Sequence, residues 1–349
     1  MNAQRITKAI VTTVLGVAAT LMLTGCPWYD QDYSFDFDFI VTDTPKNLEK
    51  LNTAYDDYNA VAPYFLDRYD FFFSTNRNSQ GVDFDIICVP LDISYHRKKD
   101  LTNISFLEDP VLSEVHEDLL SRANNGSDQL GPNFLLKKEG YHYFFYADDE
   151  VGNFDIKFIY GKADNLWGFK DSQSLEGPFE ASLVNSAYDD LYPAFDKDGN
   201  ILVFCSNRED GTTFNIYEIN LADLGVGAER VLHEVLDAEP TEAEKVAVLS
   251  SQGNDKCPFL LGNTLVFASD RESGRGGYDL YYARRTGNTW SNPVSFGNVI
   301  NSEYNEYRPM LVCLFPYYSV LLFFSSDRPG GKGGYDLYCV DVTELFKEL

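Results

Sequence analysis

Phe267-Ala-Ser-Asp-Arg-Glu-Ser-Gly-Arg-Gly-Gly-Tyr-Asp-Leu-Tyr281 and Phe324-Ser-Ser-Asp-Arg-Pro-Gly-Gly-Lys-Gly-Gly-Tyr-Asp-Leu-Tyr338 are two copies of one sequence unit. In each copy an aromatic strand enters a polar, glycine-rich turn and leaves it through an aromatic–Asp–aliphatic step. Three looser copies precede them: Phe73-Ser-Thr-Asn-Arg with Phe84-Asp-Ile-Ile87, Tyr146-Ala-Asp-Asp with Phe154-Asp-Ile-Lys157, and Phe204-Cys-Ser-Asn-Arg with Phe214-Asn-Ile-Tyr217. Repetition at this period predicts an array of five equivalent structural units.

Each unit reads as an antiparallel meander of short strands. A strand marked by proline precedes the aromatic strand in every copy, at Pro63, Pro132, Pro193, Pro258 and Pro309. Turn residues at Asp196–Asn200 and Gly262-Asn263 predict tight hairpins between these two strands. The aromatic–Asp–aliphatic step then opens a third strand. Such a meander is the usual blade of a β-propeller, and the 15% aromatic content agrees with strands.

A fourth strand is predicted before the proline strand in three copies. Pro45 leads to Leu51–Asp57, Pro178 leads to Leu183–Asp190, and Pro293 leads to Val299–Glu306. The chain therefore begins with a fourth-strand segment and ends, near Val342, after a third strand. Pairing the N-terminal strand with the last blade closes the ring and removes exposed sheet edges.

We therefore predict an all-β fold, a propeller of five four-stranded antiparallel blades. Two long insertions, Asp92–Asn125 and Asp223–Val248, are long enough to contain a further blade, so a six-bladed propeller is the alternative. The second insertion is expected to add a short helix around Ala238–Glu244, and the end of the chain another at Thr343–Leu349.

The first 25 residues have the pattern of a secretory leader. Arg5 and Lys8 precede a largely apolar run from Ala9 to Leu23, and Leu23-Thr-Gly-Cys26 resembles the bacterial lipobox. An ordinary apolar leader and a retained membrane helix are the alternatives, but the run is short for spanning a bilayer. We expect a signal peptide at 1–25, lipid on Cys26, an acidic tether at 26–44 and the propeller at 45–349. The expected location is the outer membrane, facing the periplasm or the cell surface.

The repeats resemble a known family. Ile300-Asn-Ser-Glu-Tyr-Asn-Glu306 with Pro309, followed by Ser326-Asp-Arg and Gly333-Gly-Tyr-Asp-Leu-Tyr338, resembles the WD-like repeats of TolB-type β-propellers. The resemblance covers residues 45–342 and is greatest to the versions in envelope lipoproteins and in proteins with an OmpA-like domain. It implies a non-enzymatic module for protein–protein interaction or scaffolding. Without an OmpA-like domain after the repeats, peptidoglycan binding is not expected.

The charge of the chain limits the classes of molecule that it can bind. The formal net charge is -26, and it becomes -28 when Arg5 and Lys8 leave with the leader. Such an acidic surface repels phosphate backbones, so nucleic acid is excluded as a partner. Envelope proteins, the membrane through the lipid anchor, calcium and neutral glycans remain compatible.

Nine repeated polar residues are candidate site positions. Arg77, Arg208, Arg271 and Arg328 could form a ligand-binding ring, or each could pair with carboxylates of its own or the adjacent blade; recurrence in equivalent places favours the structural interpretation. Asp85, Asp155, Asn215, Asp279 and Asp336 are interpreted as acceptors for backbone N–H groups of the neighbouring turn. The second repeat departs from the pattern, because Asp149 stands where the arginine is expected.

The sequence shows no local catalytic motif. His96, His116, His142 and His233 are scattered, and neither a Gly-x-Ser-x-Gly elbow nor a phosphate-binding loop is present. Asp196-Lys-Asp-Gly-Asn200 starts like a calcium loop, but Asn207 occupies the position of the required glutamate. We therefore predict a protein that is not an enzyme, without catalytic residues, metal or cofactor, although carboxylate-rich rims could bind calcium weakly.

The alternative function is a surface lipoprotein that binds or processes glycans, with Trp167 or Trp290 stacking on sugar rings. The two insertions are expected to carry specificity. The remaining cysteines are predicted to be buried single thiols, without metal-type spacing: Cys88, Cys205, Cys257, Cys313 and Cys339.

Overall fold

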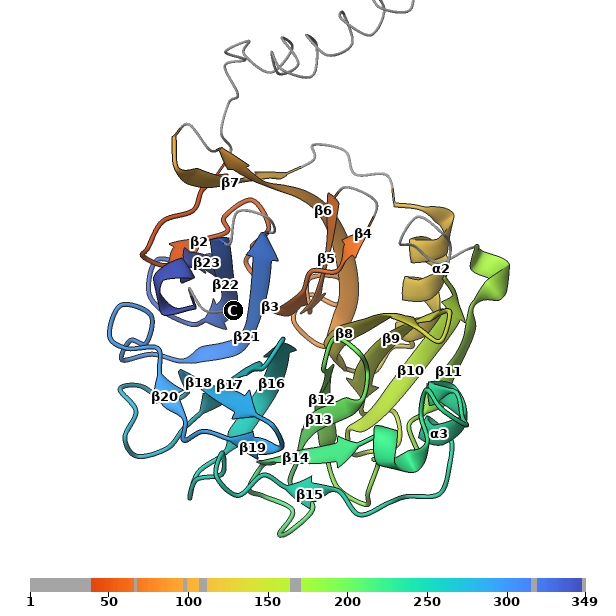
Figure 1. Cartoon of the computed structure of the whole chain (residues 1–349). Helices are drawn as coiled ribbons and strands as arrows, with labels where there is room; N and C mark the ends of the chain where they lie inside the picture. Colours follow the sequence, from red (N-terminus) through yellow and green to blue (C-terminus); the bar gives the residue numbers. More distant parts are fainter. Residues whose placement is uncertain are drawn as a thin grey trace, which may run out of the picture. The chain divides into compact units, whose positions relative to one another are not determined.

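The computed structural model describes residues 39–65, 68–96, 99–106, 112–163, 171–314 and 319–346. Residues Asp38–Leu349 form one compact unit, in which five antiparallel sheets surround a common centre (Figure 1). The predicted five-bladed β-propeller is confirmed. None of the helices in these ranges has the length and apolar character needed to cross a membrane.

The blades follow one another along the chain, each running from an innermost to an outermost strand. Blade 1 contains β3 (Asp57–Val61), β5 (Arg68–Thr75), β6 (Asp85–His96) and β7 (Leu101–Phe106), with β4 (Tyr64–Phe65) on β5 and β1 (Phe39–Ile40) on β7. Blade 2 contains β8 (Gln129–Lys138), β9 (Tyr141–Asp148), β10 (Asp155–Lys162) and β11 (Glu176–Glu180). Blade 3 contains β12 (Asp190–Phe195), β13 (Ile201–Ser206), β14 (Asn215–Asn220) and β15 (Glu244–Lys245). Blade 4 contains β16 (Asp255–Leu261), β17 (Thr264–Ser269) and β18 (Asp279–Thr286), whose outer edge pairs with β19 (Thr289–Trp290) and β20 (Val294–Ser295). Blade 5 contains β21 (Glu306–Leu314), β22 (Ser319–Ser326) and β23 (Asp336–Asp341).

The ring closes through the N-terminal part of the described chain, as predicted. The short strand β2 (Lys46–Asn47) pairs with β23, placing Lys46 opposite Cys339 and Asn47 opposite Tyr338. Strand β1 pairs with β7 of blade 1 just before it. Consecutive segments of the N-terminal region thus join the first and last blades, and two-residue strands cover part of the outer edges of β7 and β23.

The two long insertions are parts of blades and form no sixth blade. Asp92–Asn125 supplies the outer strand β7 and helix α2 (Glu114–Ala123), and Asp223–Val248 supplies helix α3 (Leu232–Leu236) and the outer strand β15. The helix expected at Ala238–Glu244 is absent from that segment and lies just upstream of it, as α3. Short 3₁₀ turns occur at η2 (Ser172–Ser174), η3 (Ala222–Leu224) and η4 (Thr343–Leu345), the last within the predicted C-terminal helix.

The predicted fourth strands are displaced in sequence. The outer strands lie at the proline-marked segments, as in β11 and β20, and the stretches that follow, which contain Asn52, Asn185 and Asn301, are turns. In these turns an asparagine replaces strand pairing: the Asn301 side chain accepts the N–H of Leu280 at 2.9 Å and donates to its C=O at 3.0 Å. Asn52 and Asn185 make the same pair of bonds to Leu337 and Ile156. The side-chain amide therefore satisfies backbone groups that a longer strand would otherwise pair.

The innermost strand of every blade has a bulge at one equivalent position. The bulged residue has a positive φ in all five blades, at Asn59, Gly131, Tyr192, Cys257 and Arg308. Proline follows it in four blades, and Ala60 follows it in blade 1. Pro63, taken from the sequence as the marker of the first inner strand, therefore lies after that strand. The prediction was wrong here because Ala60 stands where the other inner strands have proline, and Pro63 falls in the connection between β3 and β4.

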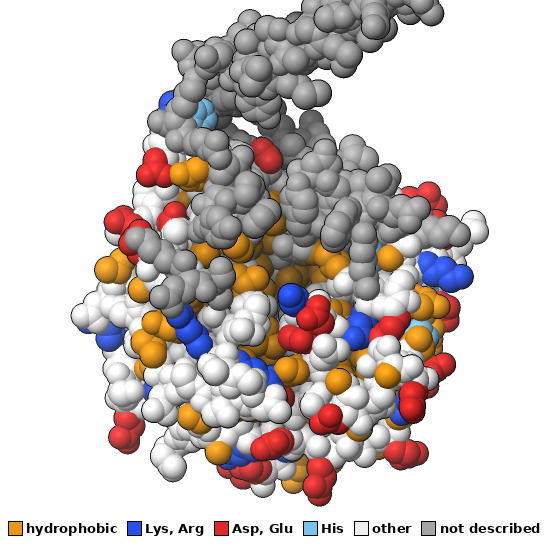
Figure 2. All heavy atoms as spheres, viewed as in Figure 1, with side chains coloured by type: hydrophobic (Ala, Val, Ile, Leu, Met, Phe, Trp, Pro, Cys, Tyr) orange, Lys and Arg blue, Asp and Glu red, His pale blue; other side chains and the backbone are white. Residues whose placement is uncertain are grey.

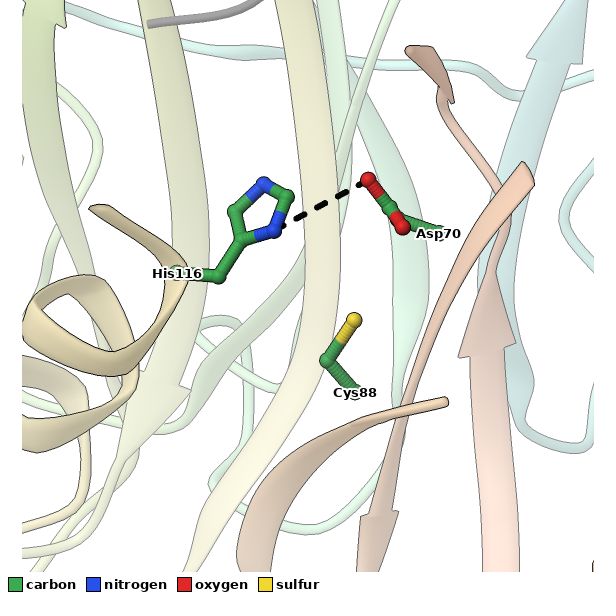
Figure 3. A group of neighbouring side chains, drawn as sticks. All are labelled: Asp70, Cys88 and His116. Carbon is green, nitrogen blue, oxygen red and sulfur yellow. Dashed lines mark ion pairs between the residues drawn. The ribbon is translucent and has the colours of Figure 1, made fainter. Parts of the chain in front are cut away.

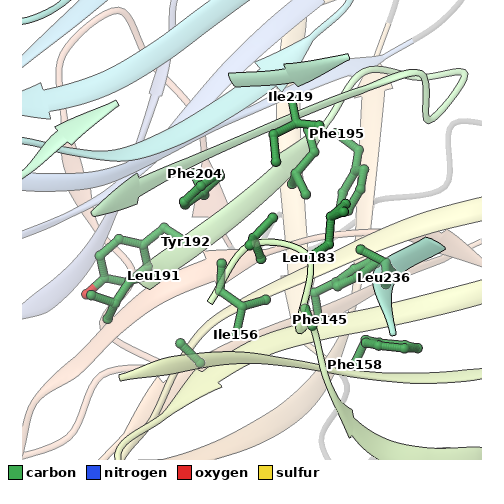
Figure 4. Close-up of a cluster of buried hydrophobic side chains, with 14 of the residues drawn as sticks. Phe145, Ile156, Phe158, Leu183, Leu191, Tyr192, Phe195, Phe204, Ile219 and Leu236 are labelled. Carbon is green, nitrogen blue, oxygen red and sulfur yellow. The ribbon is translucent and has the colours of Figure 1, made fainter. Parts of the chain in front are cut away.

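Aromatic side chains fill the space between neighbouring blades. Between blades 2 and 3, Phe145, Phe158, Phe195 and Phe204 pack with Leu236 from α3 (Figure 4). The Phe145 and Phe195 rings, on facing strands of the two blades, lie 4.5 Å apart. Each fully buried Phe contributes about 2–3 kcal/mol through removal of its apolar surface from water.

The repeated aromatic residue before each third strand connects its blade to the next. Its N–H donates to an Asp or Asn side chain of the following blade, and its C=O accepts the N–H of the next residue in that blade. The five donor–acceptor pairs are Phe84 with Asp128, Phe154 with Asp189, Phe214 with Asn254, Tyr278 with Asn305, and Tyr335 with Asp56, at 2.7–3.0 Å. The repeat unit is thus the connector between blades.

Candidate functional site

The four repeated arginines lie in structural ion pairs inside their own blades. Each reaches the first residue of its innermost strand, a carboxylate with no exposed surface. The pairs are Arg77–Asp57, Arg208–Asp190 at 2.6 Å, Arg271–Asp255 at 2.7 Å and Arg328–Glu306 at 2.9 Å. Each guanidinium also donates to a backbone carbonyl and lies over the aromatic ring two positions before the strand ends, as Arg271 does over Phe267. The structure does not bring the four arginines together around a ligand.

Blade 2 uses a different cation. Gln129 replaces the buried carboxylate of the inner strand, and Asp148 occupies the end of the second strand. Lys157 on β10 lies 3.0 Å from Asp148, 2.8 Å from Glu150 and 3.4 Å from Glu180. These three carboxylates raise the pKa of Lys157 against the opposing effect of its burial. The missing arginine is thus replaced by a lysine from the neighbouring strand.

The five repeated Asp/Asn residues open the third strands, but their partners differ. Asp336 accepts the N–H groups of Lys332 and Gly333 at 2.6 and 3.0 Å, and Asp279 accepts those of Arg275 and Gly276. Asp85 and Asp155 instead accept a side-chain amide, from Asn78 and Asn153 respectively, and Asn215 donates to the C=O of Thr213. The prediction that these residues accept backbone N–H groups of the turn is therefore confirmed for Asp279 and Asp336. Asp155 accepts a side-chain amide and so has a different environment.

The centre of the propeller narrows to a neck at Arg308. This side chain is 5% exposed, and its guanidinium lies 3.8 Å from the Tyr192 ring centroid, 4.5 Å from that of Tyr58 and 5.0 Å from that of Tyr307. The small cavity beside it, of 20 Å³, is also lined by Asn59, Asn133 and Cys257. Sequence reasoning missed Arg308; the signal was its position immediately before an inner-strand proline.

Beyond the neck, a central funnel of 330 Å³ is lined by inner strands of all five blades. Phe134, Phe195 and Phe259 supply much of its apolar wall, and Asp196 is the one carboxylate among its described lining residues. Figure 2 shows hydrophobic side chains gathered in the middle of this face, next to a few charged ones. A single carboxylate does not provide the acid–base pair that most glycosidases use.

A second cleft, of 540 Å³, lies against blade 2 and the segment after α3; we call it the blade 2–3 cleft. Its described lining residues are Val151, Asp155, Glu180, Ser182, Asn185, Ser186, Asp237, Ala238, Glu239 and Pro240. Asp155 opens β10, and Glu180 ends the paired strand β11. The cleft therefore brings together two carboxylates from adjacent strands, with Asp237 and Glu239 exposed beside them.

The environments of these two carboxylates differ. Burial, followed by the charges of Glu180 and Asp190, raises the pKa of Asp155 to about 6. Burial also raises the pKa of Glu180, while Lys157 opposes this rise by favouring the ionised form. With a pKa of about 6, Asp155 carries a proton in about half of the molecules at pH 6 and in about a tenth of them at pH 7. The sequence marked Asp155 only as a turn residue, and nothing in the pattern pointed to Glu180.

The remaining predicted residues fall into two groups. Trp290 is 6% exposed and donates to Glu218 at 2.9 Å, so it packs inside blade 4 and does not face a sugar. Cys88, Cys205, Cys257 and Cys339 are buried, Cys313 is partly buried, and these five form no disulfide. Cys26 and Trp167 lie outside the described residues.

No protein-family model matches the chain, and no curated protein matches its sequence. Solved structures do share the fold. A thermostable family-43 glycoside hydrolase is 14% identical, with a TM-score of 0.51, covering 85% of this chain and 92% of its own. An endo-arabinase from Bacteroides thetaiotaomicron is 11% identical, with a TM-score of 0.47 and coverage of 86% and 97%. A TolB-like protein of Agrobacterium tumefaciens is 14% identical, with a TM-score of 0.36 and coverage of 63% and 79%.

The family-43 glycoside hydrolase supports the β-propeller fold, and the narrower TolB-type assignment is without confirmation. The prediction that the protein is not an enzyme is contradicted, since this glycoside hydrolase has the same overall fold. The absence of local motifs was weak evidence, because a propeller assembles sites from residues on different strands and loops. The blade 2–3 cleft brings together residues of different strands, Asp155 of β10 and Glu180 of β11.

Proposed function

We propose that this protein processes neutral glycans, and that the blade 2–3 cleft is the site of the chemistry. The carrying observation is the presence of Asp155 and Glu180 in one open cleft with different surroundings. The glycoside hydrolase with the same fold supports this class of substrate over the protein-interaction module.

The two carboxylates suit the chemistry of glycosidic bond cleavage. That reaction requires a carboxylic acid that protonates the departing sugar oxygen and a second, ionised carboxylate that acts on the other side of the bond. Asp155, with its pKa raised to about 6, is the proton donor in this proposal. Glu180, held 3.4 Å from the ammonium group of Lys157, is the ionised partner. Burial raises the pKa of both carboxyl groups, but only Glu180 has a cation, Lys157, that favours its ionised form, which suits the acid role to Asp155 and the base role to Glu180.

The charge around the cleft favours an uncharged sugar chain. Glu150, Asp237 and Glu239 are exposed near the pair, and the whole chain carries a net charge of -26. A uronic acid or a sulfated sugar would be repelled by these groups. Ser182 and Ser186 supply hydroxyl groups for hydrogen bonds to sugar hydroxyls, whereas the Asn185 amide is engaged by the backbone of Ile156.

A hydrolysis assay on a panel of neutral and acidic polysaccharides tests the proposal. Asp155→Asn and Glu180→Gln should each lower the rate by about 10²–10⁴-fold, the usual effect of removing an acid or base catalyst. Asp196→Asn in the central funnel is the matched control and should retain activity. If only Asp196→Asn lost activity, the catalytic site would lie in the central funnel and not in the blade 2–3 cleft. A wild-type protein without activity on any glycan of the panel would contradict the proposal.

We also propose that the chain works in the outer envelope of a bacterium, anchored by lipid on Cys26, where it meets its glycan and neighbouring envelope proteins. The support is the sequence of residues 1–26. Fractionation of cells that produce Cys26→Ala is the test, with in-cell crosslinking to identify partners. A Cys26→Ala protein that stays in the membrane fraction and keeps its full length would contradict the anchor.

A further inference from the structure

Three buried side chains with metal-binding chemistry meet where helix α2 packs against blade 1. Asp70 lies on β5, Cys88 on β6 and His116 on α2. Their exposed fractions are 1%, 7% and 7%. Figure 3 shows the thiol of Cys88 directed toward the space between the imidazole and the carboxylate.

The spacing of the three groups is close to that of a metal coordination shell. One candidate ligand atom from each residue lies within 4.8 Å of the other two, and His116 Nδ1 is 3.8 Å from Asp70 Oδ2. This separation exceeds an ordinary N–H···O hydrogen bond. Ligand atoms of a tetrahedral zinc ion lie about 3.3–3.6 Å apart, given the usual zinc bond lengths. Side-chain adjustments of about 1 Å or less would close the shell.

The donor set selects the class of metal. A thiolate together with an imidazole suits Zn²⁺ and related transition metals, whereas Ca²⁺ and Mg²⁺ require oxygen ligands. Phe72 lies beside the group, with its ring 5.6 Å from that of His116 in a T-shaped arrangement. Charged groups in so apolar a place are stable when they are paired or coordinate a metal.

The cluster departs from the repeat. In the strand alignment, the positions equivalent to Asp70 are Tyr143, Ile201, Thr264 and Leu321, none of which is a carboxylate. Cys339 is the equivalent of Cys88 in blade 5, where Leu321 replaces the carboxylate. His116 belongs to the segment between blades 1 and 2, and among the described residues no other blade carries a helix as long as α2. Polar residues that break a repeat only where an extra helix docks indicate a specific local role.

We propose that Asp70, Cys88 and His116 bind one Zn²⁺ ion, which fastens helix α2 to the first blade. Binding replaces the thiol proton of Cys88 by the metal and releases that proton to solvent, so affinity falls as the pH is lowered. The fourth coordination position is filled by water. Helix α2 also donates from Arg122 to the C=O of Gly177 in blade 2 at 3.1 Å, so the ion stabilises the packing of α2 between two blades. This proposal is independent of the glycan-processing function.

Metal binding to the purified full chain tests the site. After chelator treatment and exchange into Zn²⁺-free buffer, added Zn²⁺ should bind with a stoichiometry of about one per chain and raise the unfolding temperature. Cys88→Ser and His116→Gln should each weaken Zn²⁺ binding by at least about 10²-fold. Loss of a residue that only supports a metal ligand already lowers metal affinity by about 10–100-fold, and loss of the ligand itself should lower it at least as much. Cys339→Ser, at the equivalent buried position of blade 5, is the matched control and should bind like the wild type.

Spectroscopy on the wild-type chain keeps the proposal testable even where a variant fails to fold. Co²⁺ in place of Zn²⁺ should show a thiolate-to-cobalt charge-transfer band, and X-ray absorption of the Zn²⁺ form should show one sulfur at about 2.3 Å. A shell of nitrogen and oxygen alone, unchanged binding in Cys88→Ser, or equal loss in Cys339→Ser would overturn the assignment.

Discussion

The backbone N–H of Tyr335 donates a 2.7 Å hydrogen bond to Oδ1 of Asp56, which lies 279 residues earlier in the chain. The C=O of Tyr335 accepts the N–H of Asp57 at 2.8 Å. The same pair of bonds is made at each of the four remaining junctions between blades. The junction between blades 5 and 1 is therefore chemically equivalent to the internal junctions. Closure therefore depends on a contact between the two ends of the propeller.

Asp56→Ala should destabilise the propeller by about 1–3 kcal/mol, because the N–H of Tyr335 loses its acceptor at the closing junction. Urea unfolding followed by tryptophan fluorescence measures the change. Asp43→Ala, at an exposed position near the start of the propeller, is the control and should change the stability by less than about 0.5 kcal/mol. Equal effects of the two substitutions would show that the junction contributes nothing beyond packing.

Arg271→Met should cost about 3–5 kcal/mol, because it leaves the fully buried carboxylate of Asp255 without its cation. Arg275→Met, on the exposed part of the same turn, should be close to neutral. Adding Asp255→Asn to Arg271→Met should recover part of the loss, since the uncompensated charge is removed. A double variant less stable than Arg271→Met would contradict this explanation. Thermal unfolding of the four proteins makes the comparison.

Gly131→Ala should destabilise the protein by about 1–3 kcal/mol more than Gly140→Ala, through steric overlap at the neck. Both glycines have a positive φ, so both substitutions strain the backbone. A Cβ at residue 131 would lie 2.7 Å from Cδ1 of Tyr192, whereas a Cβ at residue 140 meets no atom within 4 Å. The difference between their unfolding free energies isolates the packing against Tyr192. Equal values would mean that Tyr192 moves aside without cost.

Asp155 should make the stability of the protein fall as the pH rises through about 6. Its pKa is raised from 3.8 to about 6 in the folded protein, so the folded state binds the proton more tightly than the unfolded state. Its contribution is complete below about pH 3.8 and is lost on passing about pH 6. Denaturant titrations from pH 4 to 8 of the wild type and Asp155→Asn measure it: the difference between the two should change over this window. A constant difference would show that the carboxylate titrates normally.

Hydrolysis, where it is detected, should decline over the same pH range. Protonated Asp155 is the proposed proton donor, and its fraction falls as the pH passes about 6. The dependence of kcat/KM on pH for the most active substrate is the measurement. A rate that rises between pH 5 and 7 would contradict the role of Asp155 as the acid.

Much of the fold followed from the sequence because its repeat records local hydrogen bonding. The Asp/Asn-Arg turn, the glycine-rich loop and the aromatic–Asp step recur because four of the five blades use the same arginine–carboxylate ion pair and all five make the same connection to the next blade. The errors arose where a blade is irregular. Pro63 suggested an inner strand that lies at β3, and the Asn301 type of turn was taken for a strand because its side chain performs the pairing of one.

The sequence by itself determined the five repeat units, their order and the closure of the ring through the N-terminal region, since these depend on residues repeated at equivalent positions, whereas the structure decided that the two insertions form no sixth blade. Only the tertiary structure decided which chemical groups meet outside the repeat. Asp155 meets Glu180, and Asp70 meets Cys88 and His116, because adjacent strands and a docked helix place them together. Contacts of this kind are each made once, so they leave no period in the sequence, and their pKa values and metal-binding potential depend on burial that only the folded chain creates.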